Sequence, residues 1–172
     1  MTGATSLRWP LGLLIFACMG SLLVGPALPA SAHLLFRSAH AQPGEALQTR
    51  RQVLARAVQK AVNDFRASHQ LPPLRLDIRL NEAAQAHTDF MAATQVITHF
   101  GSDGSDPGKR LERAGYRWST IGENIAAGQI DAQEVVQDWI NSPAHRANLL
   151  KEGLTDIGVG YNHDYWTLDM AG

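Results

Sequence analysis

The sequence predicts an α+β domain in which several helices pack on a small, mainly antiparallel sheet. Apolar residues recur at helical spacing through most of the segment 47–150. The chain then changes character, because 156–162 and 165–171 have the composition of short strands and are joined at His163 and Asp164, as in a hairpin. Helices followed by strands, without regular alternation, are typical of α+β proteins.

The first 32 residues are predicted to be a secretory signal peptide. They carry a single charge, Arg8, followed by a long apolar run and by the small residues A-S-A at 30–32, which mark the cleavage point. A retained transmembrane anchor is the alternative, but Pro26 and a second proline would break such a helix. We therefore expect a secreted or periplasmic protein with no stable membrane anchor after cleavage.

Composition after cleavage limits how the domain is stabilised and what it binds. Cys18 is the only cysteine and lies in the apolar run, where it is interpreted as a small hydrophobic residue, so no disulfide is expected. The remaining chain, about 140 residues, is long enough for a hydrophobic core. Without Arg8 it has 14 Lys and Arg against 16 Asp and Glu. This balance, without a basic stripe, argues against a nucleic-acid partner.

The remaining chain divides into an arm and one domain. Residues 33–46 show no clear period and are expected to be a linker or N-terminal arm, so the domain is predicted to span 47–172. The stretch W-S-T-I-G-E-N-I-A-A-G-Q, residues 118–129, also lacks a period and is expected to be irregular, with a strand near 116–121 as an added possibility. Helices are expected at 47–69, 79–95, 107–113, from 131 to 141, and from 143 to about 150.

Residue types at three points mark where these helices begin. Asp106 before Pro107, and Asp131, have the side chains that accept hydrogen bonds from the first backbone amides of a helix. Ser142 before Pro143 ends one helix and is expected to cap the next.

Three side chains in turn-rich or helix-start segments are candidates for chemistry: His99, Glu123 and His145. His145 is about the third residue of its helix, where the helix dipole disfavours an imidazolium, and a neutral imidazole is the form that binds metal. Two imidazoles and a carboxylate suit a divalent cation such as zinc, with one position open. Their separations, 24 and 22 residues, are too long for a local metal motif, so the alternative is that they satisfy loop backbones.

Four stretches occur in a fixed order and close together in the sequence. They are H-F-G-S-D-G (99–104), A-G-Y-R-W-S-T-I-G-E-N-I-A-A-G (114–128), V-V-Q-D-W-I-N-S-P-A-H-R-A-N-L-L (135–150) and I-G-V-G-Y (157–161). Together they resemble the CAP superfamily, also called the SCP domain, and specifically its short, disulfide-free bacterial branch. The resemblance covers roughly residues 50–172 and implies an α-β-α sandwich with a shared cleft.

The resemblance also implies which residues line the cleft. Eukaryotic members have two His and two Glu there, and some bind a divalent cation. By motif, the corresponding residues are His99, Glu123 and His145, whereas Ser142 stands where the second Glu occurs. This Ser is typical of the W-x-x-S-x-x-H-R pattern of bacterial members. Among other polar residues, His87 is expected to be a buried structural histidine.

The favoured function is a ligand-binding or interaction module whose partner is a small molecule, a lipid or a cell-envelope component. The segment after the signal peptide has no cysteine, no G-x-S-x-G and no H-E-x-x-H, so no catalytic residue is assigned. The alternative is a zinc-assisted hydrolase in which His99 and His145 hold the metal and Glu123 is the third ligand or the general base. A third hypothesis is a protein-interaction module that uses the fold as a rigid scaffold.

Overall fold

The computed structural model describes residues 43–172. The predicted signal peptide and most of the predicted linker lie outside the described residues, so they stay predictions. The first described helix begins at Pro43, so the end of the segment expected to be a linker is helical. Within residues 43–172, no helix combines the length and the apolar composition needed to cross a bilayer.

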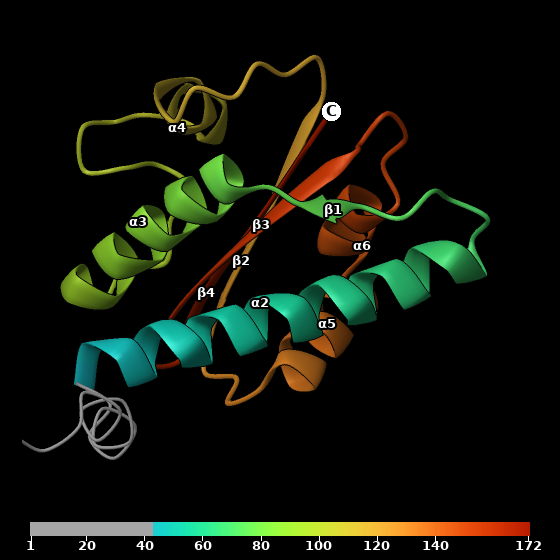
Figure 1. Ribbon diagram of the computed structural model, residues 1–172. Helices are drawn as coiled ribbons and strands as arrows, with labels where there is room; N and C mark the ends of the chain where they lie inside the picture. Colours follow the sequence, from blue (N-terminus) through green and yellow to red (C-terminus); the bar gives the residue numbers. More distant parts are fainter. Residues whose placement is uncertain (1–42) are drawn as a thin grey trace, which may run out of the picture. The chain divides into compact units, whose positions relative to one another are not determined.

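Five helices and four strands follow one another in the described part (Figure 1). In chain order they are α2 (Pro43–Ser68), β1 (Arg75–Leu76), α3 (Ile78–Thr94), α4 (Pro107–Arg113), β2 (Ile121–Ala127), α5 (Ala132–Asn141), α6 (Pro143–Leu149), β3 (Asp156–Asn162) and β4 (Tyr165–Ala171).

The strands form one mixed sheet in the order β1-β3-β4-β2. The C-terminal strands β3 and β4 pair as the predicted antiparallel hairpin, and β2 pairs antiparallel with β4. The short strand β1 pairs in parallel with β3, which makes the sheet mixed although mostly antiparallel. Helices α3 and α4 cover one side, and α2, α5 and α6 cover the other (Figure 1). The predicted α+β class and α-β-α sandwich are confirmed.

The glycines of the I-G-V-G-Y stretch allow helix α3 to lie directly on strand β3. A Cβ at Gly158 would lie 2.1 Å from the carbonyl carbon of Leu80, and one at Gly160 would lie 2.3 Å from the carbonyl oxygen of Ala84. Any side chain at these positions would collide with the helix backbone. This close approach fixes α3 over the centre of the sheet.

Side chains of α3 also complete the edge of β3 that the two-residue β1 leaves uncovered. The backbone amide of Val159 donates to Oδ1 of Asn81 at 2.8 Å, and that of Tyr161 donates to Oε1 of Gln85 at 3.1 Å. Unpaired strand edges expose amides that favour aggregation, and a helix that covers them removes that liability.

The stretch around Glu123 was wrongly expected to be irregular. Residues 121–127 form strand β2, paired along its whole length with β4, and only Ile121 falls in the region where a strand was considered. The four residues from Gly122 to Ile125 are all buried, so the stretch lacks the alternation of a strand with one exposed face. Helix α6 covers this strand, with Asn148 Cβ 3.4 Å from the position of a Cβ at Gly122.

The predicted helix starts are confirmed, with one difference in capping. The side chains of Asp106 and Asp131 accept hydrogen bonds from the first turns of α4 and α5, as expected. Ser142 is the N-cap residue of α6, but its side chain makes no capping hydrogen bond. Helix α6 therefore relies on Pro143 in its first turn and on packing.

Candidate functional site

Glu123 lies on β2 with its side chain only 2% exposed, and both of its carboxylate oxygens have a partner. Nδ1 of His99 lies 2.7 Å from Oε1, and Nη2 of Arg110 donates to Oε2. His99 and Glu123 are thus brought together, as the resemblance implied. The side chain of His99 remains 49% exposed, so it forms the accessible side of the pair.

Arg110 was missed by the sequence reasoning, although it connects the parts of this site. It lies on α4, and its Nη1 donates to the carbonyl of His99 at 2.8 Å and to that of Ser105 at 3.0 Å. One guanidinium therefore ties the 99–105 loop to the carboxylate of Glu123. Arg110 lies in the charged segment K-R-L-E-R, which is typical of an exposed helix, so nothing in the sequence indicated this role.

The electrostatics of Glu123 are decided by these two partners. Burial by itself raises the pKa of the Glu123 carboxyl, but the hydrogen bond from His99 and the charge of Arg110 outweigh it, and the net pKa is lowered. Glu123 is therefore ionised at neutral pH and accepts hydrogen bonds from both sides.

A second carboxyl, that of Asp169, was also missed. It lies on β4 directly opposite Glu123 in the strand register and is 1% exposed. Burial, together with the charge of Glu123, raises the pKa of Asp169 well above its usual range. Neither of its oxygens has a hydrogen-bond donor among residues 43–172, so the neutral acid, donating toward Glu123, is the form that suits this position. The sequence feature that could have identified Asp169 is a single carboxylate in the largely apolar segment W-T-L-D-M-A.

His145 is half-buried on α6, close enough to His99 for that charge to act on it. Burial and then His99 lower the pKa of His145, which favours the neutral imidazole expected from the sequence, although by burial rather than by the helix dipole. No hydrogen bond within the described residues joins this imidazole to His99 or to Glu123. Ser142, at the junction of α5 and α6, likewise makes no hydrogen bond to Glu123 there.

Two asparagines hold α6 against β2. Nδ2 of Asn124 donates to the carbonyl of His145 at 3.1 Å. Nδ2 of Asn148 donates to the carbonyl of Glu123 at 3.0 Å and to Oδ1 of Asn124 at 2.9 Å. The N-cap end of α6, and with it His145, is therefore positioned by the strand that carries Glu123.

Two further polar residues, His87 and Asp138, have structural partners. His87 is buried with its Nε2 2.7 Å from the carbonyl of Thr98, so it supports the backbone next to His99. Its pKa is lowered chiefly by burial. Asp138 accepts from Nε2 of Gln129 at 2.8 Å on an exposed surface.

The residues present do not fit Glu123 as a ligand of a divalent cation. In the part of the chain that the structure describes, no three His, Cys, Asp or Glu side chains converge as a metal site requires. Both oxygens of Glu123 are engaged, and Arg110 already supplies the positive charge that a cation would supply.

Exposed apolar residues lie next to His99 in the sequence. The loop after α3 exposes Val96 (51%), Ile97 (54%) and Phe100 (60%). One loop therefore carries a half-exposed imidazole and exposed apolar side chains, a combination that suits a ligand with both an apolar part and a polar group.

Comparisons with known proteins agree with this architecture. The profile of the cysteine-rich secretory protein family, CAP, matches residues 59–169. The uncharacterized protein YkwD of Bacillus subtilis is 35% identical over 117 residues, which are 67% of this chain and 46% of YkwD. Human Golgi-associated plant pathogenesis-related protein 1 is 32% identical over 106 residues, 60% of this chain and 59% of that protein.

A solved structure is also similar. It is the crystal structure of an extracellular protein containing an SCP domain from Bacillus anthracis, with a TM-score of 0.71 and 29% identity over 78% of this chain and 45% of that one. The chain thus spans less than half the length of this protein and of YkwD.

Proposed function

The chain belongs to the cysteine-rich secretory protein (CAP) family, and we propose that it is an extracytoplasmic binding module whose cleft, lined by His99, Glu123, Ser142 and His145, holds a ligand without turnover. The extracellular SCP-domain relative and the predicted signal peptide support the location. The ligand class that suits the cleft is a lipid or other envelope component with an apolar body and a hydroxyl or amide donor.

The observation that carries this proposal is that both oxygens of Glu123 are engaged by His99 and Arg110. A general base needs a pKa near the working pH and access to the proton that it removes. Glu123 instead has a lowered pKa and a side chain that is 2% exposed. These properties suit a carboxylate that orients a histidine rather than one that transfers protons.

The orientation of His99 determines the ligand group. An ionised Glu123 accepts a hydrogen bond, so Nδ1 of His99 carries a proton, and in the neutral form of the imidazole Nε2 is then an acceptor. Nε2 has no partner among residues 43–172, and the side chain is half-exposed. A hydroxyl or amide N–H of the ligand would donate to it while the apolar part contacts the exposed loop of Val96, Ile97 and Phe100.

The test is extraction of co-purified lipid, followed by titration of the protein with dodecanol and with dodecyl methyl ether, which lacks the donor. We expect saturable binding of dodecanol, about tenfold weaker binding of the ether, and a similar loss in His99→Ala, as for one net hydrogen bond. His163→Ala, in the exposed β3–β4 turn, is the matched control and should bind as the wild type does. Absence of saturable binding, or equal binding by His99→Ala, would contradict the proposal.

A further inference from the structure

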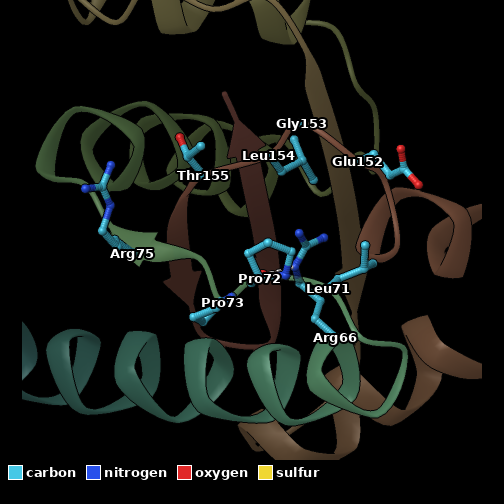
Figure 2. A pocket seen from close by; sticks show the side chains of 9 residues that line it. All are labelled: Arg66, Leu71, Pro72, Pro73, Arg75, Glu152, Gly153, Leu154 and Thr155. Carbon is cyan, nitrogen blue, oxygen red and sulfur yellow. Dashed lines mark hydrogen bonds between the residues drawn. The ribbon is translucent and has the colours of Figure 1, made fainter.

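A cavity of about 600 Å³ lies between the end of α2, the connection to β1 and the loop before β3 (Figure 2). None of the residues assigned to the cleft lines it. Its lining consists of Arg66, Leu71, Pro72, Pro73, Arg75, Glu152, Gly153, Leu154 and Thr155.

The guanidinium of Arg66 is the polar group buried at this cavity, where the residue is 1% exposed. Its Nε donates to the carbonyl of Pro72 at 3.0 Å, and its Nη1 donates to the carbonyls of Leu149 at 2.8 Å and Lys151 at 3.1 Å. These bonds use three of its five N–H groups. Nη2, which carries the other two, has no partner among residues 43–172.

The charge of Arg66 also lacks a counterion in the described part of the chain. All three acceptors are neutral carbonyls, and no carboxylate lies within ion-pair distance. Burial lowers the pKa of the Arg66 guanidinium, and no neighbouring carboxylate opposes that effect. A purely structural role, in which Arg66 ties backbone segments together, accounts for the hydrogen bonds of Nε and Nη1. It does not account for Nη2, which has no partner among residues 43–172, or for the lack of a carboxylate there, since buried charges are normally paired.

The other charged groups at the cavity do not supply that charge. Arg75 is 78% exposed on its side chain and is already paired with Asp156 at 3.1 Å. Glu152 is exposed and makes no hydrogen bond to Arg66, and Figure 2 shows its carboxylate directed away from the guanidinium. The remaining walls are largely apolar.

We propose that this cavity binds a small monocarboxylate with a short apolar body. The carboxylate accepts from Nη2 of Arg66 and neutralises its charge, and the apolar body packs on Leu71, Pro72, Pro73 and Leu154. An extended peptide is less suited to this cavity, because prolines 72 and 73 have no backbone N–H with which to pair a second chain.

The test compares two ligands that differ only in charge, octanoate and methyl octanoate, by calorimetric titration of the purified protein at pH 7. We expect one saturable octanoate site and at least about tenfold weaker binding of the ester, because charge-assisted hydrogen bonds are the strong ones. Glu152→Gln removes a like charge at the rim and should tighten octanoate binding about twofold. His99→Ala should leave octanoate binding unchanged, which separates this site from the cleft.

Arg66→Gln should abolish the preference for octanoate over its ester. If that variant does not fold, the comparison of octanoate with its ester on the wild type still decides. Equal binding of octanoate and ester, no saturable octanoate binding, or loss of octanoate binding in His99→Ala would each overturn the proposal. Tighter binding of an acetylated tetrapeptide ending in Ala-Leu with a free carboxylate would also overturn it, in favour of a peptide terminus.

Discussion

Two arginines with little exposure, Arg110 and Arg66, differ in how their charge is balanced. Both donate to backbone carbonyls of other segments. Arg110 also donates to a carboxylate, Glu123, whereas within the described residues Arg66 donates only to neutral carbonyls. The charge of Arg110 is therefore neutralised by the protein, and that of Arg66 is not neutralised by residues 43–172.

This difference shows that burial alone does not identify a binding group. A guanidinium that is paired with a carboxylate, as Arg110 is with Glu123, is held in one position and orients the residues that it contacts. One held only by carbonyls keeps its charge available for a ligand. We therefore expect substitution of Arg110 and substitution of Arg66 to change the free energy of unfolding by different amounts.

The largest expected effect is that of Arg110→Met. It leaves Glu123 ionised, 2% exposed and without its cation, so we expect the free energy of unfolding to fall by about 3–5 kcal/mol. The matched control is Arg113→Met on the same helix, whose pair with Asp103 is exposed and should contribute no more than about 1 kcal/mol. Urea unfolding at pH 7 measures the free energy of unfolding of both variants. Equal losses of stability would show that the pair of Arg110 with Glu123 contributes no more than an exposed ion pair does.

Arg66→Met should have a smaller effect, about 1–3 kcal/mol, because it leaves carbonyls unsatisfied but no buried charge unpaired. Arg56→Met, at an exposed position of the same helix, should change the free energy of unfolding by less than about 0.5 kcal/mol. A larger loss for Arg66→Met than for Arg110→Met, in the same urea experiment, would reverse the comparison.

Asp169→Asn tests whether Asp169 is neutral in the folded protein, through the pH dependence of the free energy of unfolding. A carboxyl whose pKa is raised by folding favours the folded state most at low pH, and that contribution is lost as pH rises from the ordinary Asp range to the raised pKa. The amide cannot ionise, so the variant should gain about 1 kcal/mol or more relative to wild type between pH 4 and pH 8.

Urea unfolding at several pH values between 4 and 8 measures this difference. The control is Asp164→Asn in the exposed turn before β4, which should show no such gain. Parallel curves for wild type and Asp169→Asn would mean that Asp169 is ionised in the folded protein.

The smallest expected effect concerns His145. Its lowered pKa means that its contribution to stability is present above the ordinary His range and is lost as pH falls toward the lowered value. His99→Gln removes one of the two causes, so the pKa of His145, followed by NMR, should rise. His163→Gln should leave the pKa of His145 unchanged, and a similar rise in that control would exclude a direct effect of His99.

Hydrophobic periodicity predicted the fold class, and capping residues predicted the helix starts at Asp106 and Asp131. The ordered motifs predicted that His99 and Glu123 lie together, because the family pattern places them by order and spacing. Arg110 and Asp169, which also act on Glu123, were not predicted. Arg110 resembles any charge on a short surface helix, and Asp169 is the one carboxylate in a largely apolar strand.

The strand that carries Glu123 shows a second limit. A period-two pattern identifies a strand with one buried and one solvent-exposed face, but residues 122–125 are all buried. Helix α6 covers one face, where Asn148 lies 3.4 Å from the position of a Cβ at Gly122, and Arg110 of α4 pairs with Glu123 on the other. The two-residue strand β1 was not predicted, because its pairing with β3 involves residues about 80 positions away. Such long-range pairing leaves no local pattern.

By itself, the sequence determined the family resemblance, the order of helices followed by a terminal hairpin, and the proximity of His99 and Glu123. These follow from local periodicity, capping residues and ordered motifs, all of which can be read along the chain. Only the tertiary structure decided that Arg110 neutralises Glu123, that Asp169 faces it, and that Arg66 has no carboxylate partner among residues 43–172. Charge pairing depends on which groups lie within a few ångströms in a medium of low dielectric constant, and that proximity is created by packing.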